Sequence, residues 1–114
     1  MKLSDIKNLL QCKVLTGEEA LSTEVEDVVA SDGMSEILAF AKSGELMITG
    51  LINIQSIRTA DIAGVVAVIY CRGKKPEANV IEFAKRKGIP VLVTDMVMFD
   101  ICGILYNQGL RGVS

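Results

Sequence analysis

The residues best suited to chemistry form a short basic segment, CRGKK at residues 71–75, which follows a run of apolar residues. Arg72 and the two lysines after Gly73 supply positive charge, and the glycine lets a ligand approach the backbone closely. Pro76 suits the first turn of a helix, whose free N–H groups and dipole favour a nearby anion. The segment predicts a binding site for a phosphate or carboxylate. The same residues also describe an ordinary solvated loop before a helix.

Two other segments are expected to lie beside this basic segment, and they begin at Thr49 and at Thr94. The two threonines could donate their hydroxyls to the same anion, or each could cap the helix that follows it. The segments match neither the phosphate-binding loop GxxxxGK[ST] nor the dinucleotide motif GxGxxG. The candidate ligand-binding residues are Thr49, Gly50, Asn53, Arg72, Gly73, Lys74 and Thr94.

The sequence offers little for catalysis because it contains no histidine. General base chemistry would fall to carboxylates, and those expected near the loops are Asp32, Asp95 and Asp100. Asp32 and Asp95 are better explained as helix caps. Cys71 adjoins Arg72, which could lower the pKa of the thiol, but no partner base is identifiable. We therefore assign no catalytic residue, and keep a small enzyme or redox sensor using Cys71 as an alternative.

The elements that must position these loops are three short apolar strands, ELMIT (45–49), VVAVIY (65–70) and PVLVT (90–94). Each is almost wholly apolar, which is typical of parallel strands buried on both faces. Ligands of such sheets bind at the carboxyl ends of the strands. The predicted fold class is α/β, a three-layer α/β/α sandwich with a mainly parallel central sheet.

Helices are expected between and after these strands, and shorter elements before them. Asp32 and Asp95 would cap two of the helices, Ser4 would cap the first, and glycines would end several. The expected elements are helices over 5–10, 34–42, 53–62, from Pro76 to Lys87 and over 96–107, with strands over 12–15 and, nearer a sheet edge, 25–30.

The last of these helices, 96–107, has almost no polar face. A helix that is apolar all round must be covered on both sides. It is therefore either a central core helix or a helix with one side in a dimer interface. Half of the residues are hydrophobic and only 4% aromatic, and this aliphatic excess favours a homodimer.

Composition bounds the remaining possibilities. The 114 residues suffice for one domain, 1–114. The net charge of −2 and pI near 5.1 argue against nucleic acid or an anionic membrane as partner. Cys12, Cys71 and Cys102 form no CxxC pair, so disulfides, metals and cofactors are not expected, and a reduced cytoplasm is.

The stretch from Leu46 to Leu110, with LMITGLINIQSIRTA, VVAVIYCRGKKP and GIPVLVTDMVMFDICGILY, resembles the DRTGG domain. KVLTGEE and VASDGMSEILAF resemble the first half of its stand-alone form. The resemblance implies a fold like that of the MurF and HPr kinase/phosphorylase N-terminal domains. It also implies a module found in regulatory regions, often beside CBS domains, where it looks like a dimerisation element.

The sequence departs from the family at its signature. Gly50-Leu51 stand where the Asp-Arg pair belongs, and Cys71-Arg72-Gly73 replace Thr-Gly-Gly, so only the last glycine is kept. The P-loop of HPr kinase lies in a domain absent here, so kinase activity is not implied. We expect a non-catalytic regulatory or interaction module, homodimeric, with an anionic ligand at the loops. A partner-binding subunit of another enzyme is a further alternative.

Overall fold

The structure is a computed structural model that describes residues 1–112. Within these residues one sheet holds six strands in the order β1-β5-β4-β3-β2-β6. Strands β2 to β6 run parallel, and β1 is antiparallel to β5. The predicted parallel arrangement of the three apolar strands is confirmed. The strands are β1 (Lys13–Thr16), β2 (Asp27–Ala30), β3 (Leu46–Thr49), β4 (Ala67–Tyr70), β5 (Val91–Val93) and β6 (Arg111–Gly112).

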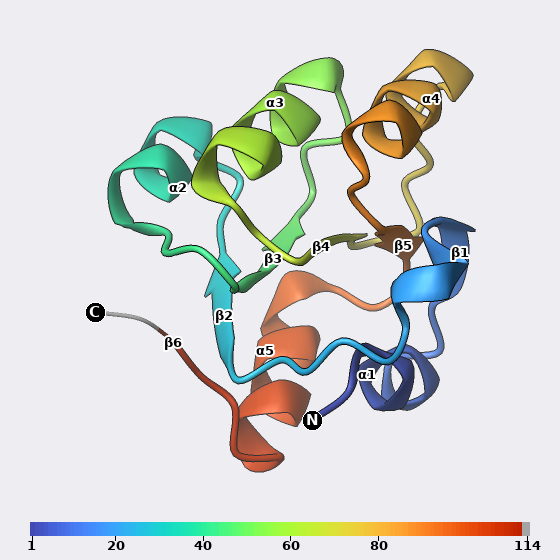
Figure 1. The fold of residues 1–114 in the computed structure, drawn as a ribbon. Coiled ribbons are helices and arrows are strands. Elements are labelled where there is room, and N and C mark those ends of the chain that lie inside the picture. Colours follow the sequence, from blue (N-terminus) through green and yellow to red (C-terminus); the bar gives the residue numbers. More distant parts are fainter. Residues whose placement is uncertain (113–114) are drawn as a thin grey trace.

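Helices cover both faces of the sheet, as the three-layer prediction requires (Figure 1). Helices α2, α3 and α4 lie on one face, and α1 and α5 lie on the other (Figure 1). The helices are α1 (Leu3–Leu9), α2 (Met34–Phe40), α3 (Ile54–Ala63), α4 (Ala78–Lys87) and α5 (Met98–Asn107), with one 3₁₀ turn, η1 (Glu18–Ala20). None of the helices in residues 1–112 combines the length and the apolarity needed to cross a bilayer.

The central strands are apolar on both sides because each side meets a different helical layer. In β3, Ile48 joins the apolar cluster that includes α1 and α5. The preceding residue, Met47, joins the cluster on the other face of the sheet with α3 and α4. Both side chains are fully buried, and burial of one such side chain contributes roughly 1.5–3 kcal/mol. This two-sided burial explains the unbroken apolar runs.

Two helices end at the glycines that the sequence predicted as their C-caps. Gly64 and Gly88 are the C-caps of α3 and α4, with left-handed φ angles of 72° and 70°. A residue with a Cβ is strained in that conformation, which explains glycine at these two positions.

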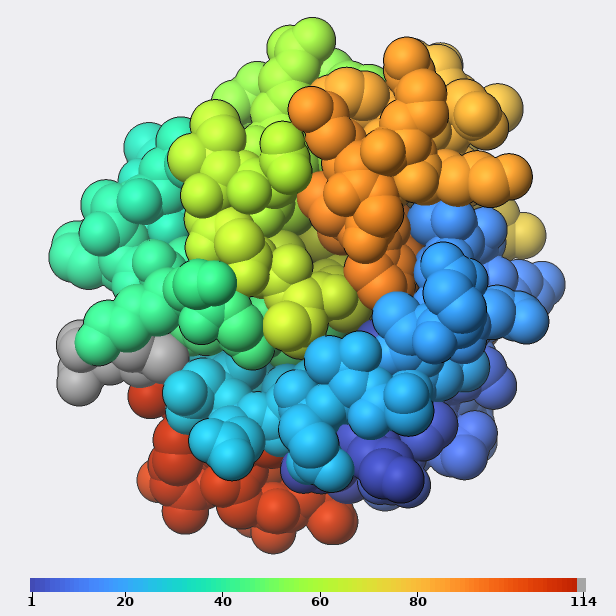
Figure 2. All heavy atoms as spheres, in the orientation of Figure 1, coloured from blue at the N-terminus to red at the C-terminus, as the bar shows by residue number. Residues whose placement is uncertain are grey.

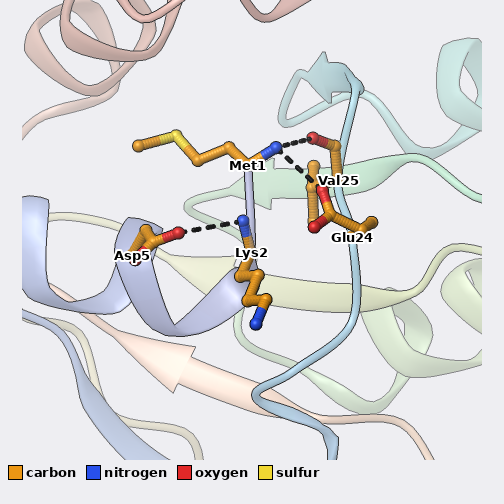
Figure 3. A network of polar contacts seen from close by, with 5 residues as sticks. All are labelled: Met1, Lys2, Asp5, Glu24 and Val25. Carbon is orange, nitrogen blue, oxygen red and sulfur yellow. Dashed lines mark hydrogen bonds and ion pairs between the residues drawn. The ribbon is translucent and has the colours of Figure 1, made fainter.

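The predicted cap at Ser4 is wrong. Helix α1 begins at Leu3, with Lys2 at the N-cap position, because an isolated antiparallel bridge to Glu24 holds Lys2 extended. The Asp5 carboxylate accepts a hydrogen bond from the Lys2 N–H at 3.2 Å, and the amine of Met1 contacts Glu24 nearby (Figure 3).

The predicted cap at Asp95 is also wrong. Helix α5 begins at Met98, and Val97 is its N-cap residue. The preceding residues are held in a turn, because the Thr94 hydroxyl accepts a hydrogen bond from the Met96 N–H at 3.2 Å. The Met96 carbonyl in turn accepts one from the N–H of Arg72 at 2.8 Å. These contacts delay the start of the helix by two residues.

Helix α5 is not the central core helix that was one of two predictions. Its inner side, with Ile101 and Leu105, is buried. Its outer side is open to solvent in this chain, where Phe99 is 86% exposed and Tyr106 is 59% exposed. The other prediction, a dimer interface on this side, remains a prediction.

Candidate functional site

The loops that follow β3, β4 and β5 meet at one edge of the sheet. The Gly73 N–H donates to the carbonyl of Thr94 at 2.8 Å. The Lys74 ammonium donates to the carbonyl of Gly50 at 3.3 Å. The prediction that Gly50, Gly73 and Thr94 share one edge is confirmed. The edge has two parts with different contents.

In the first part, a carboxylate of the protein itself accepts a hydrogen bond from the backbone N–H that could have bound the anion of a ligand. Asp32 Oδ1 accepts a hydrogen bond from the Gly50 N–H at 2.6 Å and one from the Thr49 hydroxyl at 3.3 Å. A Cβ on Gly50 would lie only 3.2 Å from the same oxygen, so glycine permits the close approach. Asp32 is not the predicted helix cap, because Gly33 occupies the N-cap position of α2. We call Asp32, Thr49 and Gly50 the closed half.

Cys71 lies beside the closed half and is not an activated thiol. Its side chain is 2% exposed, and burial raises the pKa of the thiol. The negative charge of Asp32 raises the pKa further, and the opposing effects of Arg72 and Lys74 are smaller. The predicted lowering of this pKa is therefore wrong. Since a thiol reacts as its thiolate, nucleophilic chemistry at Cys71 is disfavoured.

The second part of the edge is an open pocket of about 250 Å³ beside the ends of β4 and β5. The helices that follow these two strands lie on opposite faces of the sheet (Figure 1). In parallel α/β sheets such a reversal separates the loops and leaves a crevice in which ligands bind. We call this cavity the switch-point pocket. It is lined by Gln11, Lys13, Gly73, Lys75, Val93, Thr94 and Asp95.

The charged side chains of the switch-point pocket are two lysines and one carboxylate. Lys13 comes from β1, and Lys75 comes from the loop after β4. The Asp95 carboxylate faces Gly73, where a Cβ would lie 2.8 Å from Asp95 Oδ1. The lysines can hold a phosphate as point charges, while a carboxylate can accept a hydrogen bond from a hydroxyl or an amino group.

Two strained residues stand next to this pocket. Gln11 (φ 54°) and Arg72 (φ 65°) are the non-glycine residues with positive φ in the described part of the chain. Gln11 lines the pocket, and Arg72 precedes Gly73. Gln11 has a local reason for its left-handed φ, because it follows the last turn of α1 and the N–H groups of Gln11 and Cys12 donate to the carbonyls of Asn8 and Lys7. Arg72 has no such helix end, and a left-handed conformation of a non-glycine residue costs roughly 1–3 kcal/mol.

The side-chain hydroxyls of Thr94 and Thr49 make hydrogen bonds to other groups of the protein. The Thr94 hydroxyl donates to the carbonyl of Leu10 at 2.7 Å and accepts from the N–H of Met96. The Thr49 hydroxyl accepts from the Leu51 N–H at 3.1 Å while it donates to Asp32. Neither threonine is a helix cap, because Asn53 and Val97 hold those positions. Both threonines shape the edge.

The predicted site residues therefore share an edge but not a cavity. Gly73 and Thr94 line the switch-point pocket, and Arg72 lies next to it. Asn53 lies in a separate pocket of about 250 Å³ between the starts of α3 and α4. Gln11 and Lys13 were missing from the prediction. Asp95 was expected near the loops, but as a helix cap, and Lys75 was placed in the basic segment but not among the ligand-binding residues. No local sequence pattern marks Gln11 and Lys13 as site residues, since only the antiparallel pairing of β1 with β5 brings them to the switch-point pocket.

Comparison with known proteins settles the family. The sequence profile of the DRTGG domain matches residues 5–106. The chain belongs to the DRTGG domain family. No curated protein matches the chain. The resemblance to the N-terminal domain of HPr kinase/phosphorylase remains a prediction.

A solved structure shares the fold. It is the crystal structure of the CBS and DRTGG domains of the regulatory region of the Clostridium perfringens pyrophosphatase, complexed with the activator diadenosine tetraphosphate. The TM-score is 0.77 at 21% sequence identity, over 96% of this chain. This DRTGG chain spans about half (47%) of the length of that protein.

Within residues 1–112 no three His, Cys, Asp or Glu side chains are grouped so that they could hold a metal ion.

Proposed function

We propose that this DRTGG domain is a non-catalytic regulatory module, acting as one domain over residues 1–114 and as a homodimer. Its ligand is a phosphorylated, nucleotide-like anion that binds in the switch-point pocket. The observation that carries the proposal is the pairing of Lys13 and Lys75 around a cavity at the reversal point of the sheet.

The contents of the switch-point pocket fit a molecule with both a phosphate and a hydroxyl or amino group. Lys13 and Lys75 neutralise the phosphate, and Asp95 accepts a hydrogen bond from the other part of the ligand. Gly73 lets the Asp95 carboxylate lie close to the backbone, where a Cβ would be 2.8 Å from Asp95 Oδ1. Arg72 is exposed on the adjacent turn and adds positive charge near the pocket.

A regulatory rather than enzymatic role is supported by the chemistry of the edge. Cys71 is buried, with a raised pKa. The fold is shared with the regulatory region of a pyrophosphatase, solved in complex with its activator, diadenosine tetraphosphate. Because that protein is about twice as long, its ligand serves here only as a probe. Neither nucleic acid nor a membrane is a partner in this proposal, and the three unpaired thiols support a reducing cytoplasm.

The test is isothermal titration calorimetry of the full chain with ADP, inorganic phosphate and diadenosine tetraphosphate. We expect saturable binding of at least one of these probes. Lys75→Ala and Lys13→Ala should each weaken it about tenfold, because each removes one charge-assisted contact of roughly 1.5 kcal/mol.

Lys85→Ala is the matched control, since Lys85 is an exposed lysine in the last turn of α4 and does not line the switch-point pocket. It removes the same charge and should leave binding unchanged. Absence of binding for all three probes at millimolar concentration would refute the ligand proposal, as would equal losses in all three variants.

A further inference from the structure

The outer side of α5 is an exposed surface with an unusual composition. Phe99 and Tyr106 are largely exposed, and Asp100, Gly103 and Asn107 are exposed with them. Residues three and four positions apart lie on one side of a helix, so these residues form one continuous face, centred on Gly103. In the space-filling view the red part of the chain that includes α5 forms the lower left of the visible surface, beside the dark blue N-terminal residues (Figure 2).

No contact within residues 1–112 requires a glycine at position 103. Gly103 lies inside α5, and a Cβ placed on it would meet no described atom within 4 Å beyond its neighbours in the helix. Glycine inside a helix costs about 1 kcal/mol relative to alanine. Its remaining advantage is that the backbone of another helix can approach closely at this point.

The residues around Gly103 are arranged so that the face complements itself. Phe99 and Tyr106 lie on one flank, together with Cys102, which is three positions from the first and four from the second. Asp100 and Asn107, seven positions apart, lie on the other flank. On each flank the two residues stand three or four positions on opposite sides of Gly103.

We propose that α5 pairs with α5 of a second copy of this chain, antiparallel, about a two-fold axis at Gly103. This inference rests on the proposed homodimer and names its interface. An axis across two antiparallel helices reverses their direction and keeps each flank against the same flank. Phe99 of one copy then meets Tyr106 of the other, and the Asp100 carboxylate accepts a hydrogen bond from the Asn107 amide of the other.

A groove beside Tyr106 supplies the space for the incoming ring. It has a volume of about 220 Å³ and runs between α5 and the sheet edge at β2 and β6. Phe99 is 86% exposed, so each copy carries both a protruding ring and an apolar recess. A partner of a different kind would need only the recess, whereas a second copy uses ring and recess together. The groove is lined by Val28, Ala30, Cys102, Leu105, Tyr106, Leu110, Arg111 and Gly112.

Sedimentation equilibrium of the full chain tests the pairing. Phe99→Ala should raise the dimer dissociation constant at least tenfold, because exposed aromatic rings at interface centres dominate binding. Phe40→Ala is the matched control, since Phe40 is 71% exposed but ends α2 on the opposite face of the sheet (Figure 1). It should leave the constant unchanged.

The substitution Gly103→Leu distinguishes a loss of dimerisation from a loss of folding. Leucine favours a helix more than glycine does, so the monomer should resist urea at least as well as the wild type. The added side chain blocks close approach, so the dissociation constant should rise a hundredfold or more. A wild-type dimer that tolerates both Phe99→Ala and Gly103→Leu would overturn this interface and leave the homodimer standing. A wild type that stays monomeric at millimolar concentration would overturn both, while the calorimetric titration tests the ligand proposal separately.

Discussion

The closed half and the switch-point pocket lie at the same edge of one sheet, yet their carboxylates behave differently. In the closed half, Asp32 accepts hydrogen bonds from Gly50 and Thr49, so the chain supplies its own anion. In the switch-point pocket, the Asp95 carboxylate accepts no hydrogen bond from the described residues, and two lysines line the cavity with it. The protein's own carboxylate fills one part of the edge, whereas the other part is an open cavity lined by charged side chains.

Asp32→Ala should have the largest effect on this contrast. The Gly50 N–H and the Thr49 hydroxyl lose a charged acceptor, which should lower the free energy of unfolding by about 2 kcal/mol in urea titrations. Calorimetry should also detect a second, weaker phosphate site. The Gly50 N–H loses its acceptor in this variant, and the Lys74 ammonium, which donates to the carbonyl of Gly50, supplies positive charge beside it. Asp32→Asn keeps an acceptor oxygen and should lose less. An Asp32→Ala protein as stable as the wild type would show that the closed half is not held by this carboxylate.

The second prediction uses Cys12, which lies between two residues of the switch-point pocket. Burial raises the pKa of this thiol from 9.0 to about 11, against a smaller opposing effect of Lys7. A raised folded pKa gives stability that is complete below about pH 9, the ordinary value, and lost as the pH rises through about 11. The loss should be on the order of 2 kcal/mol.

Urea unfolding at pH 8 and pH 11 with a reductant measures this loss. Cys12→Ala should reduce the loss between the two pH values, because the substituted side chain does not titrate, while Tyr70, Cys71 and Cys102, whose pKa values burial also raises, keep part of it. An equal loss in Cys12→Ala and wild type would assign the pH dependence to other groups.

Gly73→Ala compares a crowded glycine with an uncrowded one. A Cβ at Gly73 (φ 68°) would meet Asp95 Oδ1 at 2.8 Å, whereas one at Gly88 (φ 70°) would meet nothing within 4 Å. Both alanine variants should lose about 1 kcal/mol of stability from backbone strain. Only Gly73→Ala should also displace Asp95 and weaken ADP binding severalfold in calorimetry. Equal binding by the two variants would remove Asp95 from the site.

The smallest effect concerns the reactivity of Cys71. At neutral pH its labelling by a thiol reagent should be slower than that of a peptide thiol, because burial and Asp32 raise its pKa. Asp32→Asn removes one of these causes and should speed labelling a few-fold. Labelling of wild-type Cys71 as fast as that of a peptide thiol would revive the redox alternative.

Local patterns predicted the frame of this fold. The apolar runs of β3, β4 and β5 predicted burial on both faces, and Gly64 and Gly88 predicted the ends of two helices. Both patterns can be read from the sequence because each depends only on adjacent residues. The two-residue strand β6 has no such pattern and was missed.

The site depended on contacts between distant residues. Asp32 looked like a cap because it precedes a helix, but its partner Gly50 lies 18 positions away. Lys13 reaches the pocket only through the antiparallel pairing of β1. Similarly, the apolar pattern of residues 96–107 predicted a helix covered on both sides, but it could not indicate that one side would be open to solvent within the chain.

The most direct test of the contrast is a titration of ¹⁵N-labelled protein with ADP, followed by amide chemical shifts. If the switch-point pocket is the site, the amides of Gln11, Lys13, Gly73 and Lys75 should move together and saturate, while those of Gly50 and Leu51 stay in place. Shifts at Gly50 and Leu51 without shifts at Gly73 and Lys75 would contradict the assignment of the ligand to the open half of the edge.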